Sequence, residues 1–467
     1  MSANRPPAAA APTPRPALFP SFFMGGFESA THVDRSHRRQ DYVCLTQHDR
    51  FLREDYERAR AAGLRVIREA LRWYLCDRDW RRDLYDFDSF APFVDAAQRT
   101  GLTHITCLLH YGLPDGLDLF QPDFPQRFAA FAGAFARWRV ARDDPPRWYV
   151  TVNELSFFAL AAGENAWFAP FRVGDGSTLK AILVRAALAA TDAVRAEDPH
   201  ARFVSIDPLE HRVASPTHPE LRDEAARPGE ALYHAWDMLV GRRKPELGGR
   251  PDYLDVIGVN SYPDSQTVID TQHPLPLDDP RRRQFRDMLL ETYQRFHRPI
   301  IVAETAARAD ERPVWLRYVV DECLAALRLG VDLQGICLYP LVDMREWRLG
   351  QIGTWGTLGV WDVREDHGVL HRIPNERYLA ALAEVQSRAA ASGLLPVFGE
   401  REGPSELASE ALRRMARGPR GSAASPGGRG QSPQTPTSPE EHPTSHPDDL
   451  TSDIARLLRS QQHIHRR

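Results

Sequence analysis

Apolar runs alternate with amphipathic segments from about residue 18 to about residue 391. Runs such as RWYVTV, rich in aromatic and β-branched residues, suit strands buried on both faces. The intervening segments have helical periodicity, and Gly63, Gly101 and Gly330 stand where three of them stop, as C-caps do. The predicted strands are 18–28, 64–73, 102–110, 147–154, 201–210, 251–262, 298–306 and 331–343. The predicted helices are 48–62, 88–100, 124–142, 177–197, 229–240, 280–296, 311–329 and 374–391.

Eight such alternations predict an α/β fold, a (β/α)8 TIM barrel with long βα loops. We expect a disordered arm over 1–18, the barrel over 19–395 and a low-complexity disordered tail over 396–467. A candidate short helix near 450–460 in the tail is interpreted as transient, because so short a helix is marginal alone. Three connections after strand ends are unusually long, at about 155–176, 262–279 and 344–373.

Composition narrows the class of protein. The hydrophobic fraction of 42% supports a large core, and the net charge of -4 provides no basic field for nucleic acid. The five cysteines have no C-x-x-C spacing and are predicted to be buried thiols in a reducing compartment. No signal-peptide core or membrane-spanning apolar run is present, so a cytoplasmic protein without a membrane partner is expected.

Motifs for other chemistries do not occur in the predicted barrel. It contains no H-E-x-x-H motif, no H-x-H pair on a strand and no Cys/His cluster, and neither a G-x-S-x-G elbow nor a P-loop. We therefore expect no metal and no other cofactor. The sequence does not indicate the oligomeric state.

Isolated carboxylates end two of the apolar strands. Glu154 follows the fourth strand and Glu304 the seventh, and the carboxyl ends of parallel barrel strands are where catalytic groups lie. A buried charge needs a partner, and Arg68 and Tyr262 could hydrogen-bond one carboxylate and keep it ionised. The other carboxyl group, in an apolar surround, would stay protonated. Cleavage of a glycosidic bond uses such an unequal pair.

Five motifs in barrel order carry a resemblance to a known family. They are TVNELSFFALAAGENAWFAP (151–170), HYGLPDGL (110–117), GICLYPLVDMREW (335–347), VIGVNSYP and IIVAETA. They resemble the Thr-Phe-Asn-Glu-Pro, His-Trp-Asp-Leu-Pro, eighth-strand, Ile-Gly-x-Asn-Tyr-Tyr and Ile-Thr-Glu-Asn-Gly motifs of clan A retaining glycoside hydrolases, closest to the family 1 β-glucosidase group. The match covers about residues 20–390.

The resemblance implies a role for each matching residue. Glu154 would be the general acid/base and Glu304 the nucleophile of a retaining β-glycosidase acting on a small carbohydrate or glycoside. The implied substrate-binding residues are His32, Arg68, His110, Asn153, Asn260, Tyr262, Tyr339, Glu346 and Trp347. The carboxyl groups of such an enzyme are expected about 5–5.5 Å apart.

This chain also departs from the family pattern. The departures are Leu155 for Pro, Thr305-Ala306 for Asn-Gly, Tyr339 for the platform Trp, Tyr111 for the Trp after His110, and His32 for Gln. These departures leave open the identity of the sugar and of the aglycone, and they affect the expected mechanism less. Glu28, which ends the first strand, has no counterpart in the family motifs.

At each of these positions, a structural role is the alternative to a role in catalysis or substrate binding. Glu154 could be a surface carboxylate or a helix N-cap, and Glu304 could form a structural ion pair with Arg68. His110 and Tyr339 could belong to the core, and the tryptophans of 344–373 could plug the barrel mouth. Two other functions fit the same residues, a transglycosidase and a non-catalytic sugar-binding barrel.

Overall fold

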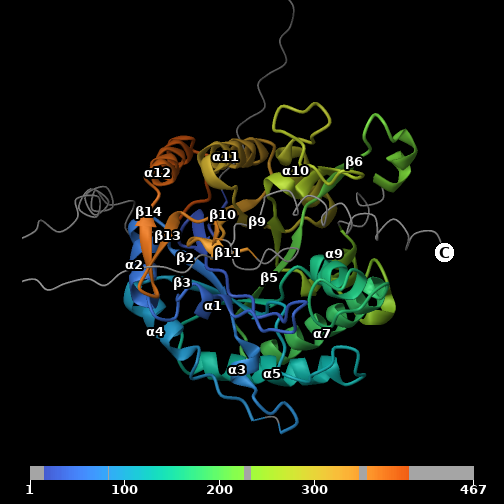
Figure 1. The fold of residues 1–467 in the computed structure, drawn as a ribbon. Coiled ribbons are helices and arrows are strands. Elements are labelled where there is room, and N and C mark those ends of the chain that lie inside the picture. The colour runs from blue at the N-terminus through green and yellow to red at the C-terminus, as the bar shows by residue number, and fades with distance from the viewer. Residues whose placement is uncertain (1–14, 83, 226–232, 347–354, 399–467) are drawn as a thin grey trace, which may run out of the picture. The chain divides into compact units, whose positions relative to one another are not determined.

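The computed structural model describes residues 15–82, 84–225, 233–346 and 355–398 (Figure 1). Its centre is a closed barrel of parallel strands in the order β1-β10-β9-β7-β5-β4-β3-β2. The barrel strands are β1 (Phe23–Gly26), β2 (Val66–Ala70), β3 (Thr103–Leu109), β4 (Arg147–Val152), β5 (Ala201–Pro208), β7 (Val256–Asn260), β9 (Ile300–Thr305) and β10 (Leu333–Leu338). All eight lie within the predicted strands, so the predicted (β/α)8 TIM barrel is confirmed.

Helices surround the strands in Figure 1. They are α1 (Tyr42–Leu45), α2 (Leu52–Ala61), α3 (Trp73–Cys76), α4 (Ala91–Thr100), α5 (Phe124–Val140), α6 (Leu155–Phe158), α7 (Gly176–Glu197), α9 (His234–Leu239), α10 (Phe285–Phe296), α11 (Arg312–Arg328) and α12 (Glu376–Ala391). Short 3-10 turns occur at Pro219–Leu221, Pro245–Leu247, Pro251–Tyr253, Pro263–Ser265 and Ala309–Glu311, and a π-helical turn at Ala159–Glu164. The eight predicted helices correspond to α2, α4, α5, α7, α9, α10, α11 and α12, with ends shifted by a few residues.

Local sequence explains several element boundaries. Gly63, Gly101 and Gly330 follow α2, α4 and α11 with positive φ, which a glycine adopts without steric cost. The side chain of Asn375 accepts a hydrogen bond from the backbone N–H of Tyr378 and so caps the start of α12.

Apolar side chains pack together in the barrel interior, beneath the carboxyl ends of the strands. Met24, Ile105, Val150 and Ile206 are among its buried members, and Phe19 lies against Trp148 with ring centroids 4.3 Å apart. Side chains alternate inward and outward along each strand, so Arg68, two residues from both Val66 and Ala70, also points inward. The interior therefore carries a guanidinium close to the carboxyl ends of the strands.

Small sheets in the connections that follow the barrel strands were not predicted. They are β6 (His211–Val213) with β8 (Gln266–Val268), β11 (Met344–Arg345) with β12 (Trp355–Gly356), and β13 (Trp361–Asp366) with β14 (Val369–Pro374). The β13–β14 hairpin lies beside α2 in Figure 1, and Arg372 of β14 forms an ion pair with Asp55 of α2. The third long connection is thus tied to the barrel wall.

Other predictions meet the structure only in part. Of the predicted arm, residues 15–18 are described, and Pro16 bridges to Val397. Residues 1–14, the tail from 399 with its candidate helix near 450–460, and Trp347 lie outside the described residues. Four cysteines are buried, but the prediction was wrong for Cys44, which is exposed because α1 buries its neighbours Tyr42 and Val43 instead.

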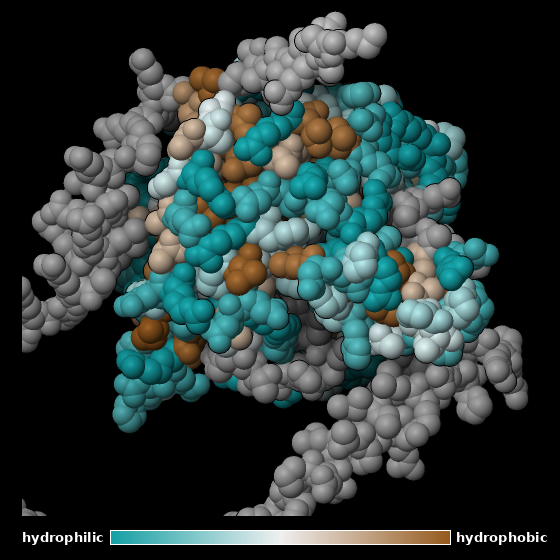
Figure 2. All heavy atoms as spheres, turned by 90° about the horizontal axis from the view of Figure 1, so that it is seen from above, coloured by the Kyte–Doolittle hydropathy of each residue, from teal (hydrophilic) through white to brown (hydrophobic). Residues whose placement is uncertain are grey.

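The surface gives two further observations. None of the described helices is long and apolar enough to cross a membrane. The face drawn in Figure 2 is largely hydrophilic, with hydrophobic residues in small separate groups.

Candidate active site

Glu304 ends β9 in a buried ion pair. Arg68 Nη1 donates to Glu304 Oε1 at 2.6 Å, and the Tyr262 hydroxyl donates to Glu304 Oε2 at 2.8 Å. The glutamate is 5% exposed and Arg68 is 2% exposed. Both carboxylate oxygens therefore accept a hydrogen bond, and the negative charge has a cationic partner within contact distance.

Glu154 stands on the turn between β4 and α6. Its backbone is left-handed, with φ 46° and ψ 66°, which costs a non-glycine residue on the order of 1 kcal/mol. Two contacts hold the turn that follows: the backbone N–H and the hydroxyl of Ser156 both donate to Asp207, at 2.9 and 2.5 Å. Asp207 ends the neighbouring strand β5, so the barrel itself fixes this conformation.

The Glu154 carboxyl accepts hydrogen bonds on both oxygens. Asn260 Nδ2 donates to Oε1 at 2.8 Å, and the Tyr111 hydroxyl donates to Oε2 at 2.5 Å. Burial, followed by the charge of Glu304, raises the pKa of Glu154 to about 8, against the effect of these two donors. The site thus pairs a carboxylate in contact with a guanidinium with a second carboxyl group whose pKa is raised by burial.

Asn153 links the two carboxyl groups. Its Oδ1 accepts from Arg68, while its Nδ2 donates to His110 Nε2 at 3.0 Å and to the Tyr111 hydroxyl at 3.1 Å. Burial lowers the pKa of His110 well below its usual range, so this imidazole is neutral and its Nε2 accepts. Asn260 makes a second link, because it pairs in register with Glu304 and donates to Glu154.

Tyr339 and His32 lie at the edge of this network. The guanidinium carbon of Arg68 is 5.0 Å from the centre of the Tyr339 ring, and the His110 and Tyr339 ring centroids are 6.4 Å apart. His32 is buried against Phe168, with ring centroids 5.2 Å apart, and burial lowers its pKa to about 4. Both rings therefore border the hydrogen-bonded network, and both residues are buried.

Glu346 is not joined to this network by any described contact. It forms an ion pair with Arg308, which precedes the Ala309–Glu311 turn. Trp347, its predicted neighbour in the site, is outside the described residues. The structure therefore brings eight predicted residues into one network: Glu154, Glu304, Arg68, His110, Asn153, Asn260, Tyr262 and Tyr339.

Three further polar residues in this region were not assigned a role from the sequence. Tyr111 contacts Glu154, and Asp207 holds the turn after it. Glu28 is buried, and desolvation raises its pKa to about 7. The position of each directly at a strand end was the available signal, but the partner of each side chain depends on long-range packing.

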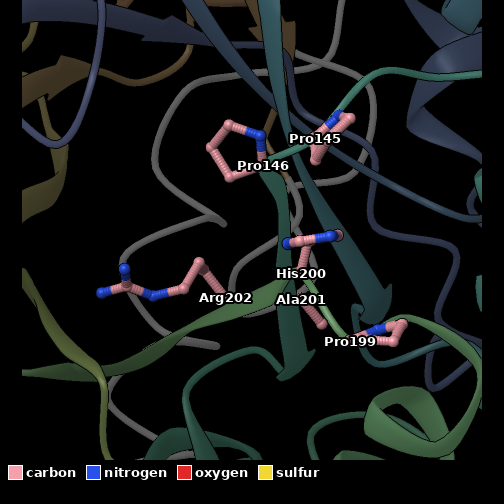
Figure 3. A pocket seen from close by; sticks show the side chains of 6 residues that line it. All are labelled: Pro145, Pro146, Pro199, His200, Ala201 and Arg202. Atoms are coloured by element: carbon pink, nitrogen blue, oxygen red, sulfur yellow. The ribbon is translucent and has the colours of Figure 1, made fainter.

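A separate pocket of about 370 Å³ lies at the opposite end of the barrel (Figure 3). It is lined by Pro145, Pro146, Pro199, His200, Ala201 and Arg202, at the start of β4 and β5. In Figure 3 the Arg202 side chain extends away from the prolines. Glu154 and Glu304 stand at the carboxyl ends of β4 and β9, at the other end of the barrel, so this pocket does not serve them.

No metal-binding group of three or more His, Cys, Asp or Glu side chains occurs in the part of the chain that the structure describes. The chemistry that the described site offers is that of its carboxyl groups and their donors. One can attack as a carboxylate, and the other can give and take a proton.

Comparisons with known proteins place the fold. No protein-family model and no curated protein matches the sequence. A β-glucosidase from Thermotoga maritima in complex with glucoimidazole superposes with a TM-score of 0.63 at 15% identity, covering 81% of this chain and 99% of that chain. A structure titled family 1 β-glucosidase, also from Thermotoga maritima, gives 0.63 at 16% identity, covering 79% and 98%. A complex of the Thermotoga maritima enzyme with deoxynojirimycin gives 0.60 at 16%, again covering 79% and 98%.

These likenesses extend over nearly the whole of each solved chain, while the sequence identity is low. They agree with the family to which the five motifs pointed. The described barrel has the fold of the family 1 β-glucosidases.

Proposed function

We propose that this chain is a retaining β-glycosidase, which hydrolyses O-glycosidic bonds through a covalent glycosyl-enzyme. Glu304 is the nucleophile and Glu154 the acid/base. The observation that carries the proposal is the unequal state of two buried carboxyl groups at one barrel end. Glu304 is paired with Arg68, whereas burial and the Glu304 charge raise the pKa of Glu154 to about 8.

In the first step the Glu304 carboxylate attacks the anomeric carbon while Glu154 gives its proton to the leaving oxygen. The aglycone departs as an alcohol, and the sugar is esterified to Glu304. Tyr262 and Arg68 donate to the oxygens of Glu304 and so aim the carboxylate.

In the second step Glu154, now a carboxylate, removes a proton from water, and the water oxygen attacks the anomeric carbon. The ester to Glu304 breaks, the sugar is released, and Glu154 is protonated again. The hydrogen bonds from Asn260 and Tyr111 stabilise the charged form of Glu154 between the two steps.

The substrate class is a small carbohydrate or glycoside. Two of the structural neighbours are β-glucosidase complexes with glucoimidazole and with deoxynojirimycin, which supports a sugar-sized ligand for the same fold. His110, Asn153 and His32 would contact sugar hydroxyls, Tyr339 would stack on the ring, and Glu346 with Trp347 would bind its far side.

A panel of nitrophenyl glycosides of several sugars, followed by proton NMR of the first product, tests the proposal. We expect turnover of at least one β-glycoside and release of the β-anomer. Release of the α-anomer would contradict the retaining mechanism and the expected carboxyl separation of about 5–5.5 Å. A lack of turnover across the panel would favour a non-catalytic sugar-binding barrel.

A further inference from the structure

Tyr111 lies two residues past the end of β3, with its hydroxyl between the two halves of the site. It follows His110, and its oxygen is 2.5 Å from Glu154 Oε2 and 3.1 Å from Asn153 Nδ2. The motif that this stretch resembles has a tryptophan here, and an indole cannot place an oxygen between these two groups. The contact is therefore a property of this chain.

The direction of these hydrogen bonds follows from Arg68. A guanidinium has donors only, so the Asn153 atom that it meets must be the carbonyl oxygen. The Asn153 amide nitrogen then faces His110 and Tyr111 and donates to both. The Tyr111 oxygen accepts from Asn153, and its O–H donates to Glu154 Oε2.

Aromatic packing fixes the Tyr111 ring in this position. Its centroid is 5.3 Å from the ring of Phe158 and 5.3 Å from the ring of Phe168. The residue is 2% exposed, and its backbone is left-handed with φ 66°. Phenylalanine would keep this packing and remove only the hydroxyl, so one atom can be tested by itself.

We propose that Tyr111 is a positioning residue that orients the Glu154 carboxyl and stabilises its charged form through an obligatory hydrogen bond. This inference rests on the proposed function, since it assigns Tyr111 to the acid/base of that reaction. The contact itself can be tested without a substrate.

The need for such a donor follows from the other groups around Glu154. Glu304 from β9 and Asp207 from β5 both disfavour its charge, and Asn260 from β7 donates to its other oxygen. Tyr262 also faces it, but the Tyr262 hydroxyl donates to Glu304. A general acid that must become a base works best with a pKa near the working pH, and the Tyr111 hydroxyl lowers the pKa of Glu154 toward that range.

The direct experiment is an NMR titration of Glu154 in the full chain, with carbon-13 in the side-chain carboxyl of glutamate. The Glu154 signal is identified by its loss in Glu154→Gln. In Tyr111→Phe we expect the pKa of Glu154 to rise by about one pH unit, the effect of losing one hydrogen bond to a charged group. An unchanged or lower pKa in this variant would overturn the proposal.

Tyr42→Phe is the matched control. Tyr42 is fully buried, and its hydroxyl has no hydrogen-bond partner among the described residues. The Glu154 titration should be the same in this variant as in the unmodified chain. A shift as large as that in Tyr111→Phe would show that any buried phenol matters, which contradicts a specific contact.

A second variant covers the case in which Tyr111→Phe does not fold. Site-specific 3-fluorotyrosine at 111 makes the phenol more acidic and the hydrogen bond to a carboxylate stronger. The pKa of Glu154 should then fall, the opposite direction to Tyr111→Phe. A rise or no change would contradict the donor role.

Kinetics add a separate readout. If the chain cleaves glycosides, the basic limb of kcat/KM against pH should move to higher pH in Tyr111→Phe, whereas a purely structural role would lower activity without moving the limb. If no glycoside is cleaved, the proposed function fails, and the titration still decides whether Tyr111 acts on Glu154.

Discussion

Two buried charged clusters in this molecule are built differently. In the first, His48 lies between Asp55 and Glu69, with both contacts at 2.8 Å, and Arg372 pairs with Asp55. Burial opposes the charge of His48, but Glu69 and Asp55 outweigh it and raise the pKa of His48 to about 9. Each carboxylate in this cluster has a cationic neighbour.

The cluster at the strand ends has an excess of acid. Glu154, Glu304, Glu28 and Asp207 are all buried there, and Arg68 is paired with Glu304. Burial raises the pKa of Glu154 to about 8, of Glu28 to about 7 and of Asp207 to about 6. Breaking a fully paired buried cluster destabilises a fold, whereas carboxyl groups in excess of their partners hold protons that chemistry can use.

The largest expected effect of a substitution is at the site. Glu304→Gln keeps the shape of the side chain but removes the proposed nucleophile, so activity should fall on the order of 10⁴-fold or more while the fold remains. Steady-state kinetics with an activated aryl glycoside measures the activity, and circular dichroism checks that the fold remains. Full activity in this variant would refute the assignment of Glu304.

The matching substitution in the paired cluster should act on stability instead. Asp55→Asn leaves Arg372 without its charged partner in the interior and leaves His48 with Glu69 alone, and such a loss costs about 3–5 kcal/mol of unfolding free energy. Urea unfolding measures it. The kcat of the folded protein should be unchanged, and a stability loss below about 1 kcal/mol would mean that the cluster is not a stabilising element.

The two clusters should also differ in their response to pH. The raised pKa of His48 means that its contribution to stability is full below about pH 6.5 and is lost as the pH rises through about 9. Activity should fall earlier, through about pH 8, because Glu154 loses the proton needed for the leaving group. The free energy of unfolding and kcat/KM should be measured over the same pH series, and we expect the two pH profiles to differ. Profiles that coincide would contradict separate roles for the two clusters.

The smallest effect on stability is expected for the pair of Arg308 and Glu346. The Arg308 side chain is 54% exposed, so the solvent screens the pair, and Arg308→Ala should change stability by less than about 1 kcal/mol. Thermal unfolding checks this. If Glu346 contacts the sugar, the variant should instead change KM for the glycoside, and an unchanged KM would argue against that role.

Sequence reasoning predicted the barrel because each strand and helix carries a local signal. The convergence of Arg68 and Glu304, 236 residues apart, also followed, since parallel strands bring their carboxyl ends to one barrel mouth. The inputs were a strand assignment and the type of residue at each end, and these left open which carboxylate Arg68 would contact.

Contacts that depend on exact side-chain reach could not be predicted in this way. The hydroxyl of Tyr111 meets Glu154, and both residues have a left-handed backbone just past the ends of the neighbouring strands β3 and β4. Arg372 meets Asp55 across 317 residues because a hairpin folds back from the last long connection onto α2. No periodicity or motif in the sequence indicates either contact.

The proposed mechanism requires a covalent bond between Glu304 and the sugar. A 2-deoxy-2-fluoro β-glycoside with an activated leaving group should inactivate the protein and add one glycosyl mass to the peptide that contains Glu304. Modification of another residue, or turnover of substrate without any trapped intermediate at Glu304, would contradict the account.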